Sequence, residues 1–312
     1  MLSPAYVALF VLHLLAVNLA SVTPLVCVWL EGGAARGDTA AQRLARSLSW
    51  HGVAALLVGG AAGLALGWLV WDPHYATAVG QLGSRLPNGI AELLFSLVLM
   101  GLHAWWWSRP TSPGRKGRWG RGLLALLAGT NLLYHFPVLM VIFARLATGD
   151  DPTTSVLDSP AFRQRLVDPV VLARCVHVWL ASVAVTGGWL LALSWSWQRQ
   201  ASDDVDAAAV ARWGARLALI PTLLQIPSGI WLLTTLSPFV QSRLLGGDLS
   251  TTSAFGASVL LALWLMHCLA AIGFGETARP QLARALALLL AVVTLMTFVL
   301  RHLEVTSLEL AR

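Results

Sequence analysis

Eight long apolar segments constrain the fold of this chain more than any other feature. Each is about 20 residues or longer, enough to cross a hydrocarbon core of roughly 30 Å as a helix. Inside a bilayer the backbone polar groups must be satisfied within the segment, which favours helices. We therefore expect an all-α integral membrane protein with eight transmembrane helices. The segments cover residues 4–30, 50–71, 89–108, 121–146, 170–195, 212–236, 254–274 and 282–301.

The composition excludes a soluble domain and points to a lipid bilayer as the surroundings. Hydrophobic residues make up 57% of the 312 residues and charged residues 12%, values typical of polytopic membrane proteins. The net charge of +6 comes almost entirely from arginine, with Lys116 the single lysine. We read it as basic loops facing the cytoplasm and expect no nucleic acid partner. No C-x-x-C-H motif is present, which excludes covalently attached c-type haem.

The basic residues also predict which side of the membrane each loop faces. Arginines gather after the first, third, fifth and seventh segments, and the remaining loops are richer in acids. The positive-inside rule then places both termini outside. We expect a multi-pass protein of the bacterial inner (cytoplasmic) membrane with periplasmic termini.

A weak internal repeat suggests how the eight helices are arranged. LHLLAVNLASVT in the first segment resembles VHVWLASVAVT in the fifth, and both segments run from outside to inside. We predict two parallel four-helix bundles. The first covers residues 1–148, and the second covers 149–312, including an outer loop at 149–169.

The fifth segment carries a histidine in a setting that suggests haem. His177 is followed at helical spacing by small residues, Ala181, Ala184 and Gly188, which would let a flat group approach the backbone. Arg174 lies one turn toward the water, where it could pair with a haem propionate. A polar residue at this depth is by default a functional hypothesis. The other interpretation is a structural histidine that is hydrogen-bonded to a neighbouring helix.

Further candidate ligands lie at membrane depth on other segments. At about 1.5 Å per residue, His13, His135 and His177 share a layer roughly 10–16 Å below the outer surface, and Met266 and His267 lie nearer the middle. Neutral imidazole and thioether sulfur are axial ligands of haem iron. We predict two haem b groups, one held by His13 with His135 and the other by His177 with Met266 or His267. Paired carboxylates, a Ser-His-Asp set and phosphate-binding glycine loops are missing from the sequence, and we assign no catalytic residue.

Several segments resemble subunit I of the cytochrome bd quinol oxidases. VLHLLAVNLASVTPLVCVWLE is similar to the first helix of that family, with His13 at a haem-ligand position and Glu31 at the helix end. LVDPVVLARCVHVWLASVAVTGGWL is similar to the fifth helix, which makes His177 an axial ligand of the low-spin b haem. Gln225 and Gly229 resemble the sixth helix.

The sequence also departs from that family. The outer quinol-binding loop between helices six and seven is reduced to residues 237–253 and lacks its lysine and glutamate. The seventh-helix methionine aligns with Leu261, or with Met266 after a shift, and His135 stands where the family has an apolar residue. Two haems with both axial positions filled suit electron transfer better than oxygen reduction.

The prediction for function is therefore a membrane b-type cytochrome of a respiratory complex. Its partners would be the other subunits of that complex and a periplasmic cytochrome c or a quinol. Two alternatives stay open. One is a minimal quinol oxidase or dehydrogenase with one open haem. The other is a haem-free metal or solute transporter or a scaffold.

Overall fold

The computed structural model describes residues 3–109, 114–149, 151, 155–200 and 206–310, and these form helices without any strand. The helices are α1 (Pro4–Ala35), α2 (Thr39–Leu69), α3 (Pro73–Leu82), α4 (Arg85–Trp107), α5 (Arg115–Ala147), α6 (Ser159–Leu166), α7 (Pro169–Arg199), α8 (Ala207–Thr235), α9 (Pro238–Ser242), the π-helix η1 (Arg243–Gly247), α10 (Leu249–Phe274) and α11 (Arg279–Leu310).

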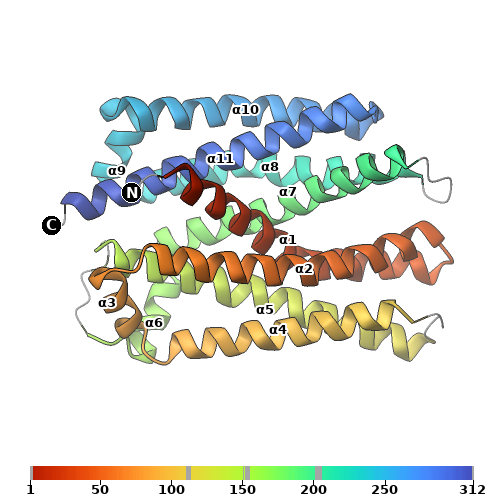
Figure 1. Cartoon of the computed structure of the whole chain (residues 1–312), viewed down its shortest axis with the longest axis horizontal. Helices are drawn as coiled ribbons and strands as arrows, with labels where there is room; N and C mark the ends of the chain where they lie inside the picture. The colour runs from red at the N-terminus through yellow and green to blue at the C-terminus, as the bar shows by residue number, and fades with distance from the viewer. Residues whose placement is uncertain (1–2, 110–113, 150, 152–154, 201–205, 311–312) are drawn as a thin grey trace.

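Eight of these helices are long and apolar enough to cross a membrane, namely α1, α2, α4, α5, α7, α8, α10 and α11. The prediction of an all-α, eight-span membrane protein is therefore confirmed. α1 begins and α11 ends at the same end of the molecule, which also carries α3, α6 and α9 (Figure 1). We call this the outer end, because the charge distribution predicts it to lie outside, and the opposite end the inner end.

Side-chain caps fix where most helices begin. A serine or aspartate before the first turn accepts a hydrogen bond from a backbone N–H that the helix leaves unpaired. Such a cap typically stabilises the helix by about 1 kcal/mol. The caps are Ser3, Asp38, Asp72, Asp158, Asp168, Asp206, Ser237 and Asp248.

The long helices pack in the same pattern in both parts of the chain. In the first part α1 packs on α2 and α5, and α4 packs on the same two helices. In the second part α7 packs on α8 and α11, and α10 packs on those two. The two groups meet where α7 contacts α1 and α5, and where α11 contacts α1. This packing agrees with two four-helix bundles, although the boundary at residue 148 stays a prediction.

Glycines allow the closest contacts within each bundle. A Cβ on Gly59 of α2 would lie 2.8 Å from Cγ1 of Val17, and a Cβ on Gly187 of α7 would lie 2.6 Å from the carbonyl oxygen of Gly214. Carbon atoms do not approach so closely, so a larger residue would force the helices apart. Gly59 and Gly63 of the second segment thus pack against α1, as small residues in membrane helices commonly do.

Pro137 interrupts the hydrogen bonds of α5 at membrane depth. Proline has no N–H, so the carbonyl of Leu133 one turn earlier loses its helical partner. The indole Nε1 of Trp179 on α7 donates to that oxygen at 2.8 Å. A neighbouring helix therefore satisfies the group that the proline leaves free, as the lipid-embedded setting requires.

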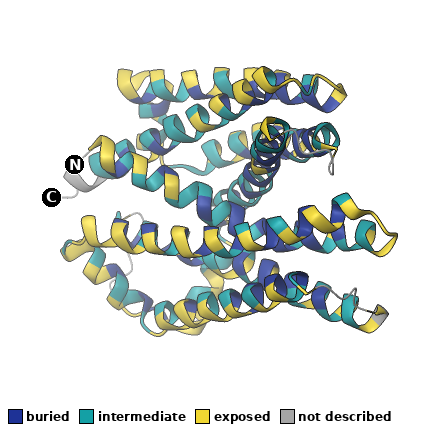
Figure 2. Ribbon diagram, turned by 45° about the vertical axis from the view of Figure 1, so that its right-hand side comes forward, coloured by how far each residue is buried: buried dark blue, intermediate teal, exposed yellow. Residues whose placement is uncertain are grey.

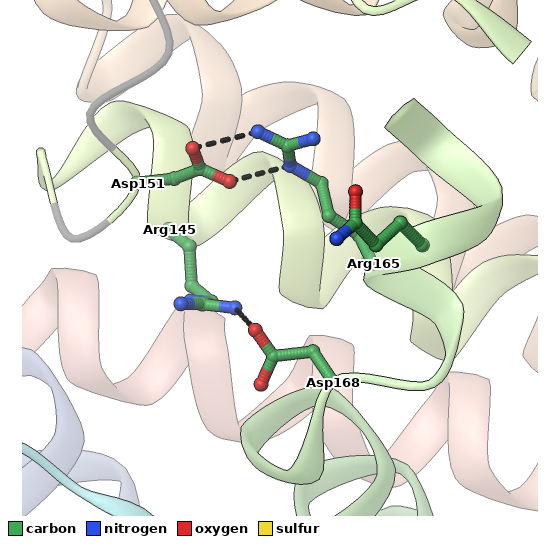
Figure 3. A pocket seen from close by; sticks show the side chains of 5 residues that line it. Arg145, Asp151, Arg165 and Asp168 are labelled. Carbon is green, nitrogen blue, oxygen red and sulfur yellow. Dashed lines mark hydrogen bonds and ion pairs between the residues drawn. The ribbon is translucent and has the colours of Figure 1, made fainter. Parts of the chain in front are cut away.

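Ion pairs fix the segment between α5 and α7 at the outer end. Arg145 pairs with Asp168 at 2.7 Å, and Arg165 pairs with Asp151 at 2.5 Å. With Gln164 these residues line an open hollow of about 310 Å³ (Figure 3). Because the charges are paired with one another, we read this hollow as part of the outer-end framework.

Candidate cofactor site

His13 lies between α1 and α2 with one ring nitrogen fixed. Its Nδ1 is 2.8 Å from the carbonyl oxygen of Gly59, which can only accept, so Nδ1 carries the proton. Gly63 makes room for the ring, since a Cβ there would lie 2.8 Å from Cε1 of His13. Among the described residues, nothing forms a hydrogen bond with Nε2. His13 therefore presents an unprotonated Nε2, which is the form that binds a metal.

His177 is held in the same way on α7. Its Nδ1 lies 3.3 Å from Oγ of Ser228 on α8, and that hydroxyl donates its own proton to the carbonyl of Gln225. The serine oxygen therefore accepts from Nδ1–H, and Nε2 again has no hydrogen-bond partner within the described parts of the chain. Gly229, the next residue of α8, lies beside the ring with its Cβ position 3.9 Å from Cε1.

His103 provides a contrast, because its accepting nitrogen is already used. The indole of Trp107 donates to Nε2 of His103 at 3.1 Å, and the guanidinium of Arg121 lies 3.5 Å from the centre of the Trp107 ring. Arg121 in turn makes two hydrogen bonds to Glu31, at 2.6 and 2.8 Å. This buried chain ties α1, α4 and α5 together at the inner end, so Glu31 has a structural partner there.

His135 of α5 is exposed. Its ring lies edge-on to the ring of Tyr134, with 4.9 Å between the ring centres, and Tyr134 is 61% exposed. Helical spacing also puts buried Ala128, Leu132 and Leu139 near the same face, at seven, three and four residues from His135. Within the described residues, the ring contact of His135 is with its neighbour on the same helix.

The structure also gives the depth of His135 relative to His13. Arg121 pairs with Glu31, and a Cβ on Gly129 would lie 2.7 Å from Leu25, which fixes how α5 runs against α1. Counting from these contacts, His135 and His13 lie about four to six residues apart along the bundle, roughly 6–9 Å at 1.5 Å per residue. The predicted shared layer is consistent with this spacing.

Met266 and His267 point in directions about 100° apart on α10, and only Met266 is buried. Met266 is 7% exposed and faces the bundle. His267 is exposed and faces away from it. The face of His267 carries only exposed apolar side chains, namely Leu260, Leu263, Trp264 and Phe274. His267 is therefore not directed at His177.

Met266 also lies much deeper than His177. At the outer end Asp248 contacts His302, and Glu304 interacts electrostatically with Arg174, which places Asp248 and Arg174 at about the same level. From that level His177 is three residues inward and Met266 is eighteen, a difference on the order of 20 Å along the helices. The structure does not bring the two side chains together.

The small-residue stripe after His177 is only partly available to a cofactor. A Cβ on Gly188 would lie 2.4 Å from Cδ2 of Leu289, so this glycine serves the contact between α7 and α11. Ala184 is buried, while Ala181, one turn from His177, is half-buried. Our expectation of a slot along all three residues is wrong at Gly188, because a leucine of the neighbouring helix fills it.

Around His177 the second bundle lacks a packed apolar core. Its core cluster is built from the inner halves of α7, α8, α10 and α11, from Leu191, Ala215, Leu269 and Leu288 among others. In the outer halves of α8 and α10, the buried residues all carry hydroxyl groups, namely Thr222, Ser228, Thr251 and Ser258. Figure 2 shows how buried and exposed residues are distributed over the helices. The buried apolar packing of the second bundle is therefore concentrated in its inner half.

These features define an eight-span helical membrane protein in which two inward-held histidines each present Nε2. In the described residues, no group of three or more His, Cys, Asp or Glu side chains is placed to hold a metal ion. Sequence reasoning found both histidines but missed the partners Gly59 and Ser228. For Gly59, the regular glycine spacing of the second segment was the one sequence feature that indicated a close contact with another helix.

The bd oxidase from Geobacillus thermodenitrificans has a similar solved structure, with a TM-score of 0.77 at 14% sequence identity. The superposition covers 96% of this chain and 86% of that chain. At this identity the likeness shows a shared fold. No protein-family model and no curated protein matches the sequence.

Proposed function

We propose that this protein is a membrane b-type cytochrome that holds two haem b groups and carries electrons within a respiratory membrane complex. The observation that carries the proposal is the matching environment of His13 and His177. Each donates its Nδ1 proton to a neighbouring helix, to Gly59 or Ser228. Haem-ligating histidines use this arrangement, because the bond to Nδ1 fixes the ring and directs the Nε2 lone pair to the metal.

In this proposal the protein's own residues orient and enclose the cofactor. His13 and His177 would bind iron through Nε2, and His135 would approach the first haem from the facing helix. Bound haem supplies a one-electron redox centre. The loosely packed outer halves of α8 and α10 would enclose the second haem, and the bilayer would exclude water from both. The fold likeness to a bd oxidase supports a place beside other subunits in a bacterial inner membrane, with a quinol or a periplasmic cytochrome c as electron donor.

The position of Met266 favours a second candidate function. Because Met266 lies on the order of 20 Å deeper than His177, it does not supply a sixth ligand at that level. A haem held by His177 alone would keep one open axial position, as a minimal quinol oxidase needs. The two candidate functions thus differ in whether a second residue, besides His177, would bind the haem iron.

The test is a pyridine haemochrome count on the purified full chain, for wild type, His177→Ala and His267→Ala. We expect two haems per chain in wild type, one in His177→Ala and two in His267→Ala, whose side chain faces outward. A colourless wild type would overturn the proposal, and equal loss in both variants would overturn the ligand assignment. Carbon monoxide added to the reduced protein separates the two functions, because a spectral shift that depends on His177 indicates an open iron.

A further inference from the structure

A buried arginine at the outer end has an unused hydrogen-bonding edge. Arg301 of α11 is 5% exposed. Its Nη1 contacts Glu304 at 3.2 Å, and its guanidinium lies 4.5 Å from the centre of the Tyr6 ring. Tyr75 of α3 also interacts with Arg301. The Nε of Arg301 is buried and has no hydrogen-bond partner among the described residues.

Such an arrangement is costly unless something else binds there. A buried donor without an acceptor costs about 1–3 kcal/mol, and a guanidinium carries five N–H groups arranged to grip a carboxylate with two bonds. Glu304 takes only one of them, at Nη1. Nε therefore remains available for a further acceptor oxygen, such as one of a carboxylate.

Two interactions place Arg301 at the same depth as His177. Near the middle of the helices a Cβ on Gly188 of α7 would meet Leu289 of α11, and at the outer end Arg174 interacts electrostatically with Glu304. α7 and α11 run in opposite directions, so these contacts fix their register over about four turns. Three residues inward from Arg174 is His177, and three residues inward from Glu304 is Arg301.

We infer that Arg301, with Tyr6 and Tyr75 beside it, forms a carboxylate-binding site at the level of His177. The inference rests on the proposed function for its first source of ligand, a propionate of the haem held by His177. A small soluble carboxylate would present the same chemistry, and Arg174 on the facing helix would add a second positive charge in either case.

The experiment compares two porphyrins that differ only in their carboxylates. The full chain, freed of bound haem, is titrated with iron protoporphyrin IX and with its dimethyl ester. We expect wild type to bind the free acid about tenfold more tightly, the equivalent of one charge-assisted bond. Arg301→Gln should bring that ratio close to one, and Arg301→Lys should restore part of it. Arg212→Gln, which removes an arginine from a partly exposed ion pair with Asp206 at the inner end, is the matched control.

Different results would overturn the carboxylate site at Arg301 and the proposed haem-binding function. If Arg301→Gln and wild type show the same ratio, the assignment to a propionate is overturned. If wild type binds neither porphyrin, the proposed function fails. Thermal unfolding in acetate and benzoate then decides: a rise in Tm that Arg301→Gln abolishes supports the site, and no rise overturns it. Tyr75→Phe, which removes one hydroxyl group, gives a second test of the site should Arg301→Gln fail to fold.

Discussion

Ser182 of α7 donates a 2.7 Å hydrogen bond to the side-chain oxygen of Asn18 on α1. Asn18 is the fifth residue after His13, and Ser182 is the fifth residue after His177. Equivalent positions of the two bundles therefore touch each other. Because α1 and α7 run in the same direction, this contact is what an approximate two-fold axis along the bundle would produce. The axis passes between the two candidate haem ligands.

The contact predicts unequal effects from its two residues. The carbonyl of Val178 lies 2.9 Å from the same Ser182 hydroxyl, so after Asn18→Leu the hydroxyl proton still has an acceptor. Ser182→Ala leaves the Asn18 amide without its partner in a half-buried place. We expect a loss of about 1–2 kcal/mol for Ser182→Ala and less than about 1 kcal/mol for Asn18→Leu. Unfolding of the detergent-solubilised protein measures both, and equal losses would contradict this account.

The bond from Trp179 to the carbonyl of Leu133 predicts a compensating pair of substitutions. Trp179→Phe removes the donor and should cost about 1–3 kcal/mol, because the carbonyl is left unpaired at membrane depth. Pro137→Ala restores an N–H within α5, which can serve the same carbonyl. We therefore expect Trp179→Phe to cost less in the Pro137→Ala background than in wild type. A double-mutant cycle of unfolding free energies tests this, and simple additivity would refute it.

Gly63 should be sensitive to substitution because of the His13 ring beside it. Gly63→Ala places a methyl group 2.8 Å from Cε1 of His13, so the ring must move away from Gly59. We expect a loss of about 1–3 kcal/mol from overpacking, together with the loss of the haem proposed at His13. Gly67, one turn further along, has no atom within 4 Å of its Cβ position. Gly67→Ala should therefore be neutral in both unfolding and haem content.

Asp168 should make the outer end sensitive to acid. Burial favours a higher pKa for this carboxyl, but the hydrogen bonds from Arg145 and from the backbone N–H of Val170 lower its pKa below the usual value. A carboxyl with a lowered pKa stabilises the fold above its ordinary pKa, and that contribution is lost as the pH falls through the lowered value. Asp168→Asn keeps a good helix cap but loses the ion pair. The Tm difference between wild type and Asp168→Asn should be present at pH 7 and shrink toward pH 3.

The sequence was informative about features that depend on local pattern. The apolar lengths predicted all eight spans, because crossing a bilayer sets a minimum length for each. The 237–253 segment was predicted as a loop, yet it contains α9 and η1, and α10 begins at Leu249. An Asp-Pro at the start of α3 and a Ser-Pro at the start of α9 were signals for these short helices.

The candidate site was predictable only in part. Depth follows from counting residues, so the layer of His13 and His135 could be expected. Counting residues does not give the direction of a side chain: Met266 and His267 are adjacent, yet Met266 is buried and His267 is exposed. Contacts between distant helices, such as Gly188 with Leu289 or His177 with Ser228, depend on how the bundle assembles, and a single sequence carries no record of them.

The uneven packing of the second bundle has a consequence for biogenesis. Its inner half can reach its final structure as soon as the helices have been inserted, because leucine and alanine side chains already fill it. Under the proposed function, its outer half would gain further cohesion only when haem binds. Maturation would then proceed from the inner end outward, with cofactor loading as the last step, and a quality-control protease would recognise the haem-free chain at its outer end.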